Sequence, residues 1–318
     1  MSDIVTITFS PCIDKSTSVS QLIPEKKLKC AYPKLEPGGG GINIARAIKK
    51  LGGDATAIFP AGGYTGKYFI ELMRKENVPS VIIETENETR ENIIVLDEST
   101  NQQYRFGMPG NPLLDSEWKN ILKELEQLNE VKYIVASGSL PPGVPVAIFS
   151  DIAAIANRKN AKFIADTSGE SLKHAASHGV FLLKPNLAEL SYLAGKKIVE
   201  IEEVPAIAEQ LIANGSCEAM VVSLGGAGAM LVTATMKIKI TPPPVQQKST
   251  VGAGDSMVAG IVLSLYNHND LETAVEYGVA CGTAATLSEG TGLCKPEDVN
   301  RLFAAIRNKM KVSLSGSN

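Results

Sequence analysis

The sequence lacks both a membrane-spanning segment and a dense cluster of basic residues. Hydrophobic residues make up 44% of the 318, but they form no uninterrupted run of about 18, the length that a membrane-spanning helix needs. Lysine and arginine number 31 against 34 aspartates and glutamates, which gives a net charge of −3. This near-balance offers no electrostatic support for binding nucleic acid or a membrane surface. The N-terminus has no signal-peptide pattern, so we expect a cytoplasmic protein.

Cysteine and histidine are also scarce. The five cysteines are scattered along the chain and form no C-x-x-C pair. Their distribution argues against a disulfide framework and against a cysteine-based zinc site. We therefore expect small, mostly buried cysteines, and surface roles for the three histidines.

What the sequence does contain is a repeated alternation of apolar strands and amphipathic helices. We expect strands at 4–9, 55–60, 81–84, 133–136, 162–165, 180–183 and 219–222, and helices at 42–51, 67–76, 115–129, 146–159 and 203–213. Gly62–Gly66 is expected to be a turn. Continuous apolar strands are typical of a parallel sheet that is covered on both faces. We therefore predict an α/β fold with a mostly parallel central sheet and helices on both of its faces.

Two segments interrupt this alternation. Residues 16–35 contain Pro24 and Pro33 and lack helical periodicity, so we expect short strands there, with Lys27 and Lys29 on one face. Residues 88–106 are typical of a β-hairpin. We expect both to form one small sheet, a lid over the site. The predicted organisation is an α/β core of residues 1–13, 36–86 and 108–312, a lid of residues 14–35 and 87–107, and a flexible tail of residues 313–318.

Two glycine-rich turns each lead directly into a helix. Gly38–Gly41 precede the helix at 42–51, and Gly252–Asp255 precede a second apolar helix. Such turns leave backbone N–H groups free to bind an anion. In the first helical turn the dipole favours an ionised Asp255. An anion site beside a carboxylate suits phosphoryl transfer to an alcohol. The alternative is an aspartate that only caps its helix.

Polar and glycine residues also gather where the expected strands end, which is where open α/β sheets bind ligands. Asp14 follows the first strand, and Asn186 and Glu189 follow the strand at 180–183, spaced to hold a hydrated Mg²⁺ on one helix face. Lys27 and Arg90 are either ligands for a phosphate or solvated surface cations. Because the sequence has neither a Walker A motif nor G-x-G-x-x-G, no P-loop or dinucleotide-binding site is expected.

The order of Gly38–Asn43, Asn186 with Glu189, and Gly252–Asp255 along residues 3–310 resembles the ribokinase-like carbohydrate kinases of the PfkB type. Within that family, the glycine run and residues 104–106, 137–143 and 249–256 look most like the bacterial 6-phosphofructokinase branch. Gly40 stands where related 1-phosphofructokinases and tagatose-6-phosphate kinases tend to carry lysine.

The resemblance implies an enzyme, an ATP-dependent sugar-phosphate kinase that converts fructose 6-phosphate to fructose 1,6-bisphosphate. Asp255 matches the family's general base, and the backbone N–H groups of Gly252, Ala253 and Gly254 match its anion hole. The resemblance also implies Mg²⁺, K⁺ and a homodimer whose lids pair. Alternatives are a tagatose-6-phosphate kinase, a 1-phosphofructokinase, or an inactive regulator that binds a sugar phosphate.

The other family positions follow residue by residue. Substrate contacts match Asp14, Lys27, Gly39, Gly40, Gly41, Asn43, Arg90 and Ser139. Nucleotide contacts match Lys184, Asn186, Ser223, Gly225, Gly228, Gln247, Val279 and Thr283. Glu189 matches a position that holds Mg²⁺ through water, and the K⁺ positions match Ser249, Val251, Ala285, Ser288, Gly290 and Gly292. Gln247 and Ser288 depart from the residues that this branch carries, so the nucleotide edge and the cation loop can differ.

Overall fold

The structure, a computed structural model, describes residues 2–288, 290 and 292–315. These residues form a nine-stranded central sheet in the order β13-β12-β11-β10-β9-β8-β1-β4-β5. The strands are β1 Ile4–Ile7, β4 Thr56–Gly62, β5 Ser80–Thr85, β8 Tyr133–Ser137, β9 Lys162–Asp166, β10 Val180–Leu183, β11 Cys217–Ser223, β12 Ala229–Thr233 and β13 Lys237–Ile240. Within this sheet, the seven strands from β11 to β5 in the order given are all parallel to their neighbours, as predicted. Strands β12 and β13 form an antiparallel edge that the sequence analysis missed.

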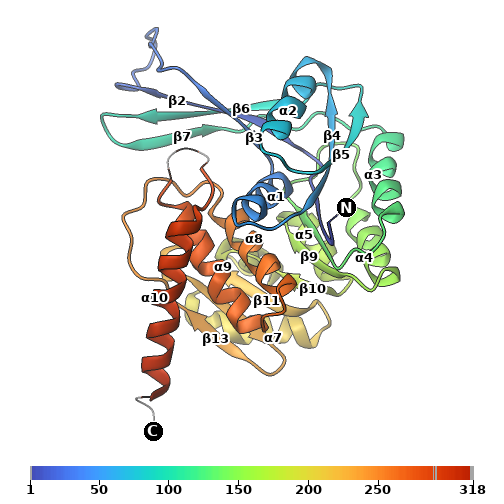
Figure 1. The fold of residues 1–318 in the computed structure, drawn as a ribbon, viewed down its shortest axis with the longest axis vertical. Helices are drawn as coiled ribbons and strands as arrows, with labels where there is room; N and C mark the ends of the chain where they lie inside the picture. The colour runs from blue at the N-terminus through green and yellow to red at the C-terminus, as the bar shows by residue number, and fades with distance from the viewer. Residues whose placement is uncertain (1, 289, 291, 316–318) are drawn as a thin grey trace.

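Helices cover both faces of this sheet (Figure 1). They are α1 Gly40–Lys50, α2 Gly63–Lys75, α3 Asp115–Gln127, α4 Ile148–Arg158, α5 Gly169–Ala176, α6 Leu187–Leu193, α7 Val204–Ala213, α8 Ala253–Tyr266, α9 Leu271–Ala285 and α10 Pro296–Ser315. Successive strand residues face opposite sides. Ile134 belongs to the apolar cluster with α3 and α4, and Val135 to the cluster with α1, α8 and α9. The predicted α/β architecture is therefore confirmed.

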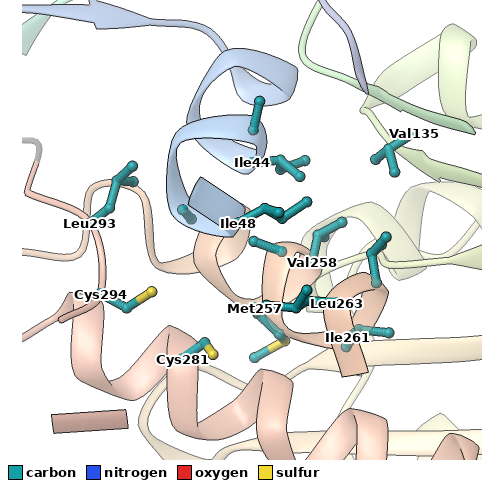
Figure 2. Packing of buried hydrophobic residues seen from close by; sticks show 14 of the residues in the cluster. Ile44, Ile48, Val135, Met257, Val258, Ile261, Leu263, Cys281, Leu293 and Cys294 are labelled. Carbon is teal, nitrogen blue, oxygen red and sulfur yellow. The ribbon is translucent and has the colours of Figure 1, made fainter. Parts of the chain in front are cut away.

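Helix α8 lies in the middle of the apolar cluster that contains Val135, between α1 and α9. Figure 2 shows Ile44 and Ile48 of α1 near Val258 of α8, with Cys281 of α9 on the other side of α8. Residues 256–265 of α8 are all buried. This packing fixes the first turn of α8, which carries Asp255, relative to α1. Asp255 is thus positioned by the packing of two helices.

The turn expected at Gly62–Gly66 is wrong, because α2 begins at Gly63. The carboxylate of Glu88 accepts hydrogen bonds from the backbone N–H groups of Tyr64 (3.1 Å) and Thr65 (3.0 Å). A side chain more than 20 residues away therefore satisfies donors that a local cap usually satisfies. Nothing in the sequence around Gly63 signals this long-range cap.

A second sheet contains the two segments that interrupt the α/β alternation. Its order is β3-β2-β6-β7, formed by β2 Cys12–Val19, β3 Lys34–Gly38, β6 Arg90–Asp97 and β7 Gln102–Phe106. Figure 1 shows this sheet projecting from the body of the molecule. The prediction that residues 16–35 and the hairpin share one small sheet is confirmed. The strands expected around Lys27 and Lys29 are wrong, because residues 20–33 connect β2 to β3 without forming a strand.

Three further expectations concern the cysteines, the C-terminus and membrane spans. Four cysteines are buried, but Cys30 is exposed in the segment that joins β2 to β3. Helix α10 runs to Ser315, so the first half of the expected tail 313–318 is helical and residues 316–318 lie outside the described part of the chain. Among the described residues, no helix is long and apolar enough to cross a bilayer.

Candidate active site

Asp255 lies in the first turn of α8, directly after a glycine-rich turn. Gly252 adopts a left-handed conformation (φ +72°) and caps a helix that begins at Ala253. Glycine adopts this conformation without the steric cost that other residues incur. The start of α8 therefore presents backbone N–H groups and the positive end of the helix dipole beside a carboxylate. This arrangement agrees with the sequence-based interpretation of the motif.

The helix that follows the first glycine run, Gly38–Gly41, contacts Asp255. Gly39 (φ +115°) caps α1, and Asn43 in the next turn donates from Nδ2 to Oδ2 of Asp255 over 2.9 Å. The glycines allow α1 to start unusually close to β1 and β8. A Cβ on Gly40 would lie 2.1 Å from Oγ of Ser137, and one on Gly41 would lie 2.6 Å from the carbonyl oxygen of Ile7. Only glycine fits in this packing.

Asp255 is poised to exchange a proton near neutral pH. Burial, and to a smaller extent the negative charge of Asp166, raise the pKa of its carboxyl group to about 7. The hydrogen bond from Asn43 and the charge of Lys184 lower that pKa, and Asp14 raises it. We expected the helix dipole to favour the ionised form, and here desolvation outweighs it. A pKa near the working pH is what a general base needs.

Asp166 is a residue of the site that the sequence analysis did not single out. It ends β9, and its Oδ1 lies 3.0 Å from Nζ of Lys184, which follows β10. Burial by itself lowers the pKa of Lys184, but the Asp166 carboxylate, together with Glu189 and Asp255, holds that pKa above its usual value. A Cβ on Gly254 would lie 3.6 Å from the ammonium. Lys184 thus brings a fixed positive charge to the start of α8, where a phosphate would approach.

Asp14 is buried on β2, against the start of the first glycine run. Its Oδ1 accepts hydrogen bonds from Nδ2 of Asn92 on β6 (3.0 Å) and from the thiol of Cys12 (3.3 Å). A Cβ on Gly38 would lie 2.3 Å from Oδ2. The register that pairs Asp14 with Asn92 explains this contact, which spans both halves of the small sheet. One polar wall therefore combines β2, β6 and the first glycine run.

The predicted cationic residues occupy different settings. Arg90 on β6 donates to the carbonyl oxygens of Met108 (2.7 Å) and Ser10 (3.0 Å), while its buried Nε has no partner among the described atoms. Its guanidinium is therefore held by backbone carbonyls. Lys27 is exposed between β2 and β3, and no hydrogen bond or ion pair joins it to another described residue of its own chain. Ser139 is exposed in the segment after β8.

A cavity of about 480 Å³ adjoins Ala253 and Gly254, within the size range of small-ligand sites. Six of the eight predicted nucleotide-binding residues line it: Ser223, Gly225, Gly228, Gln247, Val279 and Thr283. Sequence reasoning missed other lining residues, among them Thr250 and Pro242–Val245. Arg105 of β7 donates from Nη2 to Oγ1 of Thr250 over 3.1 Å, so the small sheet reaches the edge of this cavity.

Asn186 and Glu189 form a reciprocal cap on α6. Oδ1 of Asn186 accepts from the backbone N–H of Glu189, and Oε2 of Glu189 accepts from that of Asn186, each over 2.9 Å. Burial raises the pKa of the Glu189 carboxyl group. The amide and carboxylate are thus fixed in place by capping. They do not lie free on one helix face, as the spacing had suggested.

The positions matched to a K⁺ site lie on two loops that are hydrogen-bonded to each other. Ser249 donates from Oγ to the carbonyl oxygen of Gly290 over 2.8 Å, and the Ser288 hydroxyl donates to that of Leu293 over 3.2 Å. Val251 donates its N–H to Oγ of Ser249, the carbonyl of Ala285 accepts from the N–H of Ser288, and Gly292 belongs to the same segment. Hydroxyl and carbonyl oxygens are the ligand type that hard cations prefer. Within the described chain, no group of three or more His, Cys, Asp and Glu residues offers an alternative metal site.

Comparison with known proteins gives the family directly. The sequence matches the pfkB family of carbohydrate kinases over residues 3–298. The chain belongs to this family. It is 43% identical, over 302 residues, to the ATP-dependent 6-phosphofructokinase isozyme 2 of Escherichia coli strain K12, an alignment that covers 95% of this chain and 98% of that protein. The resemblance inferred from the glycine motifs is therefore confirmed at the level of family and branch.

Solved structures agree with this membership. The crystal structure of phosphofructokinase-2 from Escherichia coli in complex with potassium superposes with a TM-score of 0.92 at 42% identity, covering 96% of this chain and 100% of the other. The structure of that protein in complex with fructose-6-phosphate gives a TM-score of 0.91 at 41% identity, with the same coverage. The two-sheet architecture is thus shared with pfkB kinases.

Proposed function

We propose that this pfkB kinase transfers the γ-phosphoryl group of ATP to fructose 6-phosphate, forming fructose 1,6-bisphosphate and ADP. The observation that carries the proposal is the position of Asp255. Its carboxylate stands in the first turn of α8, where it accepts a hydrogen bond from Asn43, and the preceding residues Ala253 and Gly254 line the cavity. The similarity to a 6-phosphofructokinase over nearly the whole chain supports the choice of acceptor.

In the proposed reaction the primary hydroxyl of the sugar attacks the γ-phosphorus of ATP. Asp255 accepts the hydroxyl proton as the new O–P bond forms. The bond from the γ-phosphorus to the β–γ bridging oxygen breaks, and ADP leaves with that electron pair. The N–H groups of Gly252, Ala253 and Gly254 stabilise the charge on the transferred phosphoryl, and one such donor is typically worth about 3–4 kcal/mol. Lys184 adds a fixed positive charge at the same place.

The remaining predicted residues have proposed roles in binding. Asp14, Asn43 and the N–H groups of the glycine run orient the sugar, while Arg90 and Ser139 contact it near the entrance. Lys27, which is exposed, reaches the 6-phosphate from the partner's lid. Asn186 binds the nucleotide phosphates, and the residues that line the 480 Å³ cavity hold the rest of the nucleotide.

Two cations are included in the proposal. The half-buried carboxylate of Glu189, near Lys184, would hold Mg²⁺ through water, and the ion would supply positive charge against the phosphates. The loops around Ser249 and Gly290 would hold K⁺ through hydroxyl and carbonyl oxygens, which suit a hard monovalent ion. The structure of the related Escherichia coli protein in complex with potassium is consistent with this choice.

The test is an ADP-release assay with purified protein and three candidate acceptors: fructose 6-phosphate, fructose 1-phosphate and tagatose 6-phosphate. We expect the highest kcat/KM with fructose 6-phosphate, and a loss of activity without Mg²⁺ or K⁺. A higher kcat/KM for either other sugar would assign the chain to a different activity of the same family. Sugar binding without ADP release, measured by calorimetry, would indicate a regulator instead.

We also propose a cytoplasmic homodimer that forms through the small sheet. Several apolar side chains on or beside this sheet are exposed, namely Ile93, Tyr104, Phe106 and Met108. A second copy of the sheet would cover such a surface. Light scattering after gel filtration should give about twice the chain mass, and Tyr104→Asp should give the monomer. A wild-type monomer at micromolar concentration would contradict this part of the proposal.

A further inference from the structure

Arg46 is the largest fully buried side chain of the molecule as described, with 1% of its surface exposed. It lies on α1, one turn after Asn43, and the proposed reaction assigns it no role. Burying a guanidinium is costly unless it is paired and hydrogen-bonded. Glu36 and Glu76 pair with its Nη2 at 3.3 and 2.8 Å. The ion pairs explain how the charge is tolerated but not what the side chain does.

The other terminal nitrogen of Arg46 faces the site. Nη1 donates to Oδ1 of Asn43 over 3.3 Å and to the carbonyl oxygen of Pro37 over 2.7 Å. The same Asn43 amide donates from Nδ2 to Oδ2 of Asp255 over 2.9 Å. A guanidinium has only donors, and a carboxylate has only acceptors. If the Asn43 amide were flipped, its NH₂ group would face the donors of Arg46, and its oxygen would face the acceptor oxygen of Asp255.

We propose that Arg46 is a positioning residue, which holds the Asn43 amide in the one orientation that presents an N–H to the Asp255 carboxylate. This inference rests on the proposed role of Asp255 as the base. Through Pro37, the same guanidinium also anchors the chain just before the first glycine run. Arg46 thus acts through a neighbour and need not touch the substrate.

Arg46 acts on the Asp255 carboxyl through the Asn43 amide and not through the charge of its own guanidinium. Two carboxylates, Glu36 and Glu76, already offset that charge within the ion-pair network. The groups that act on the Asp255 carboxyl come from other elements: Asp166 from β9, Lys184 after β10 and Asp14 from β2, besides Asn43 itself. A hydrogen bond to the charged form of an acid lowers its pKa. Losing the fixed amide should therefore raise the pH at which Asp255 ionises.

The test compares Arg46→Met with Glu76→Gln, which removes an ion pair but keeps the Arg46–Asn43 contact. For Arg46→Met we expect the acidic limb of the kcat profile to move upward by about one pH unit, with activity at pH 7 falling about 5-fold and recovering at pH 9. For Glu76→Gln we expect reduced stability and an unmoved limb. If both variants lose stability and neither moves the limb, Arg46 is only structural and the proposal fails.

A second readout does not depend on turnover. ¹³C-carboxyl NMR of aspartate-labelled protein, with the Asp255 signal identified by its loss in Asp255→Asn, reports ionisation of that carboxyl directly. In an Asn43→Ala background, Arg46→Met should produce no further shift, because the amide that links the two groups is gone. An additional shift in that background would show that Arg46 acts by its charge and would overturn the inference.

These readouts separate the two proposals. If the wild type turns over none of the sugar phosphates, the proposed function fails, while the NMR titration still decides the role of Arg46. If Arg46→Met does not fold, Arg46→Lys replaces it, because lysine keeps one charged donor in place of the planar fork. An upward shift smaller than one pH unit then supports the inference, and an unshifted titration refutes it.

Discussion

Nζ of Lys184 and Oδ1 of Asp166 lie 3.0 Å apart at the ends of two adjacent parallel strands, with 6% and 14% of their side chains exposed. The pair places a buried cation and a partly buried anion near the start of α8. Asp166 raises the pKa of Asp255, whereas Lys184 lowers it. The pKa of the proposed base therefore depends on two residues that are distant from it in the sequence.

The first prediction concerns this pair. Lys184→Met would leave Asp166 without its counter-ion. We therefore expect the free energy of unfolding, measured by urea denaturation, to be about 3–5 kcal/mol lower than that of the wild type. Lys173→Met is the matched control, because Lys173 pairs with Glu170 on the surface. We expect little or no loss of stability there, because exposed ion pairs contribute little. Equal losses in both variants would contradict the structural argument.

The second prediction is the loss of the proposed base. General-base catalysis contributes about 10²–10⁴-fold, so Asp255→Asn should lower kcat by at least about 100-fold. Sugar-phosphate binding measured by calorimetry should persist, since asparagine has nearly the same size. A near-normal kcat in this variant would remove Asp255 from the mechanism.

The third prediction follows from the pKa of Asp255, which is about 7. A base must be ionised to accept a proton, so kcat should rise with pH through about 7 and level off above it. In Asp166→Asn a negative charge that raises this pKa is absent, and the rise should move to lower pH. A flat profile between pH 5 and pH 9 would exclude ionisation of Asp255 as the controlling step.

The fourth prediction concerns stability and follows from the same pKa. Unfolded, an aspartate ionises near pH 4, so below that pH both states are protonated and burial of Asp255 has no ionic cost. As pH rises from about 4 to 7 the unfolded state alone ionises, and the stability of the folded state falls. Asp255→Asn removes this cost. Its melting temperature relative to wild type should therefore be higher at pH 8 than at pH 5, by about 2–4 °C.

The fifth prediction tests the close approach of α1 to β8. A Cβ on Gly40 would lie 2.1 Å from Oγ of Ser137 and 2.9 Å from the backbone nitrogen of Gly138. Gly40→Ala should therefore destabilise the fold by about 1–3 kcal/mol and reduce activity. Gly107→Ala is the control, because nothing lies within 4 Å of a Cβ at that position. Thermal unfolding of both variants makes the comparison, and equal melting temperatures would contradict the packing argument.

Much of the candidate site was predictable because its signals are local. The glycine runs before α1 and α8 identify Asn43 and Asp255, since a glycine turn that opens a helix is recognisable from a few residues. Asp166 and Arg46 were not predictable in the same way. Their partners, Lys184 for one and Glu36, Glu76 and Asn43 for the other, depend on strand order and on how α1 packs.

The sequence by itself determined the alternation of strands and helices, the two glycine-led helix starts and the family. Each of these depends on backbone geometry or on periodicity within a short segment. Only the tertiary structure decided that Glu88 caps α2, that residues 20–33 form no strand and that Asp255 has a pKa of about 7. The physical reason is that capping, burial and charge pairing are properties of neighbours in space, and here these neighbours come from distant parts of the chain.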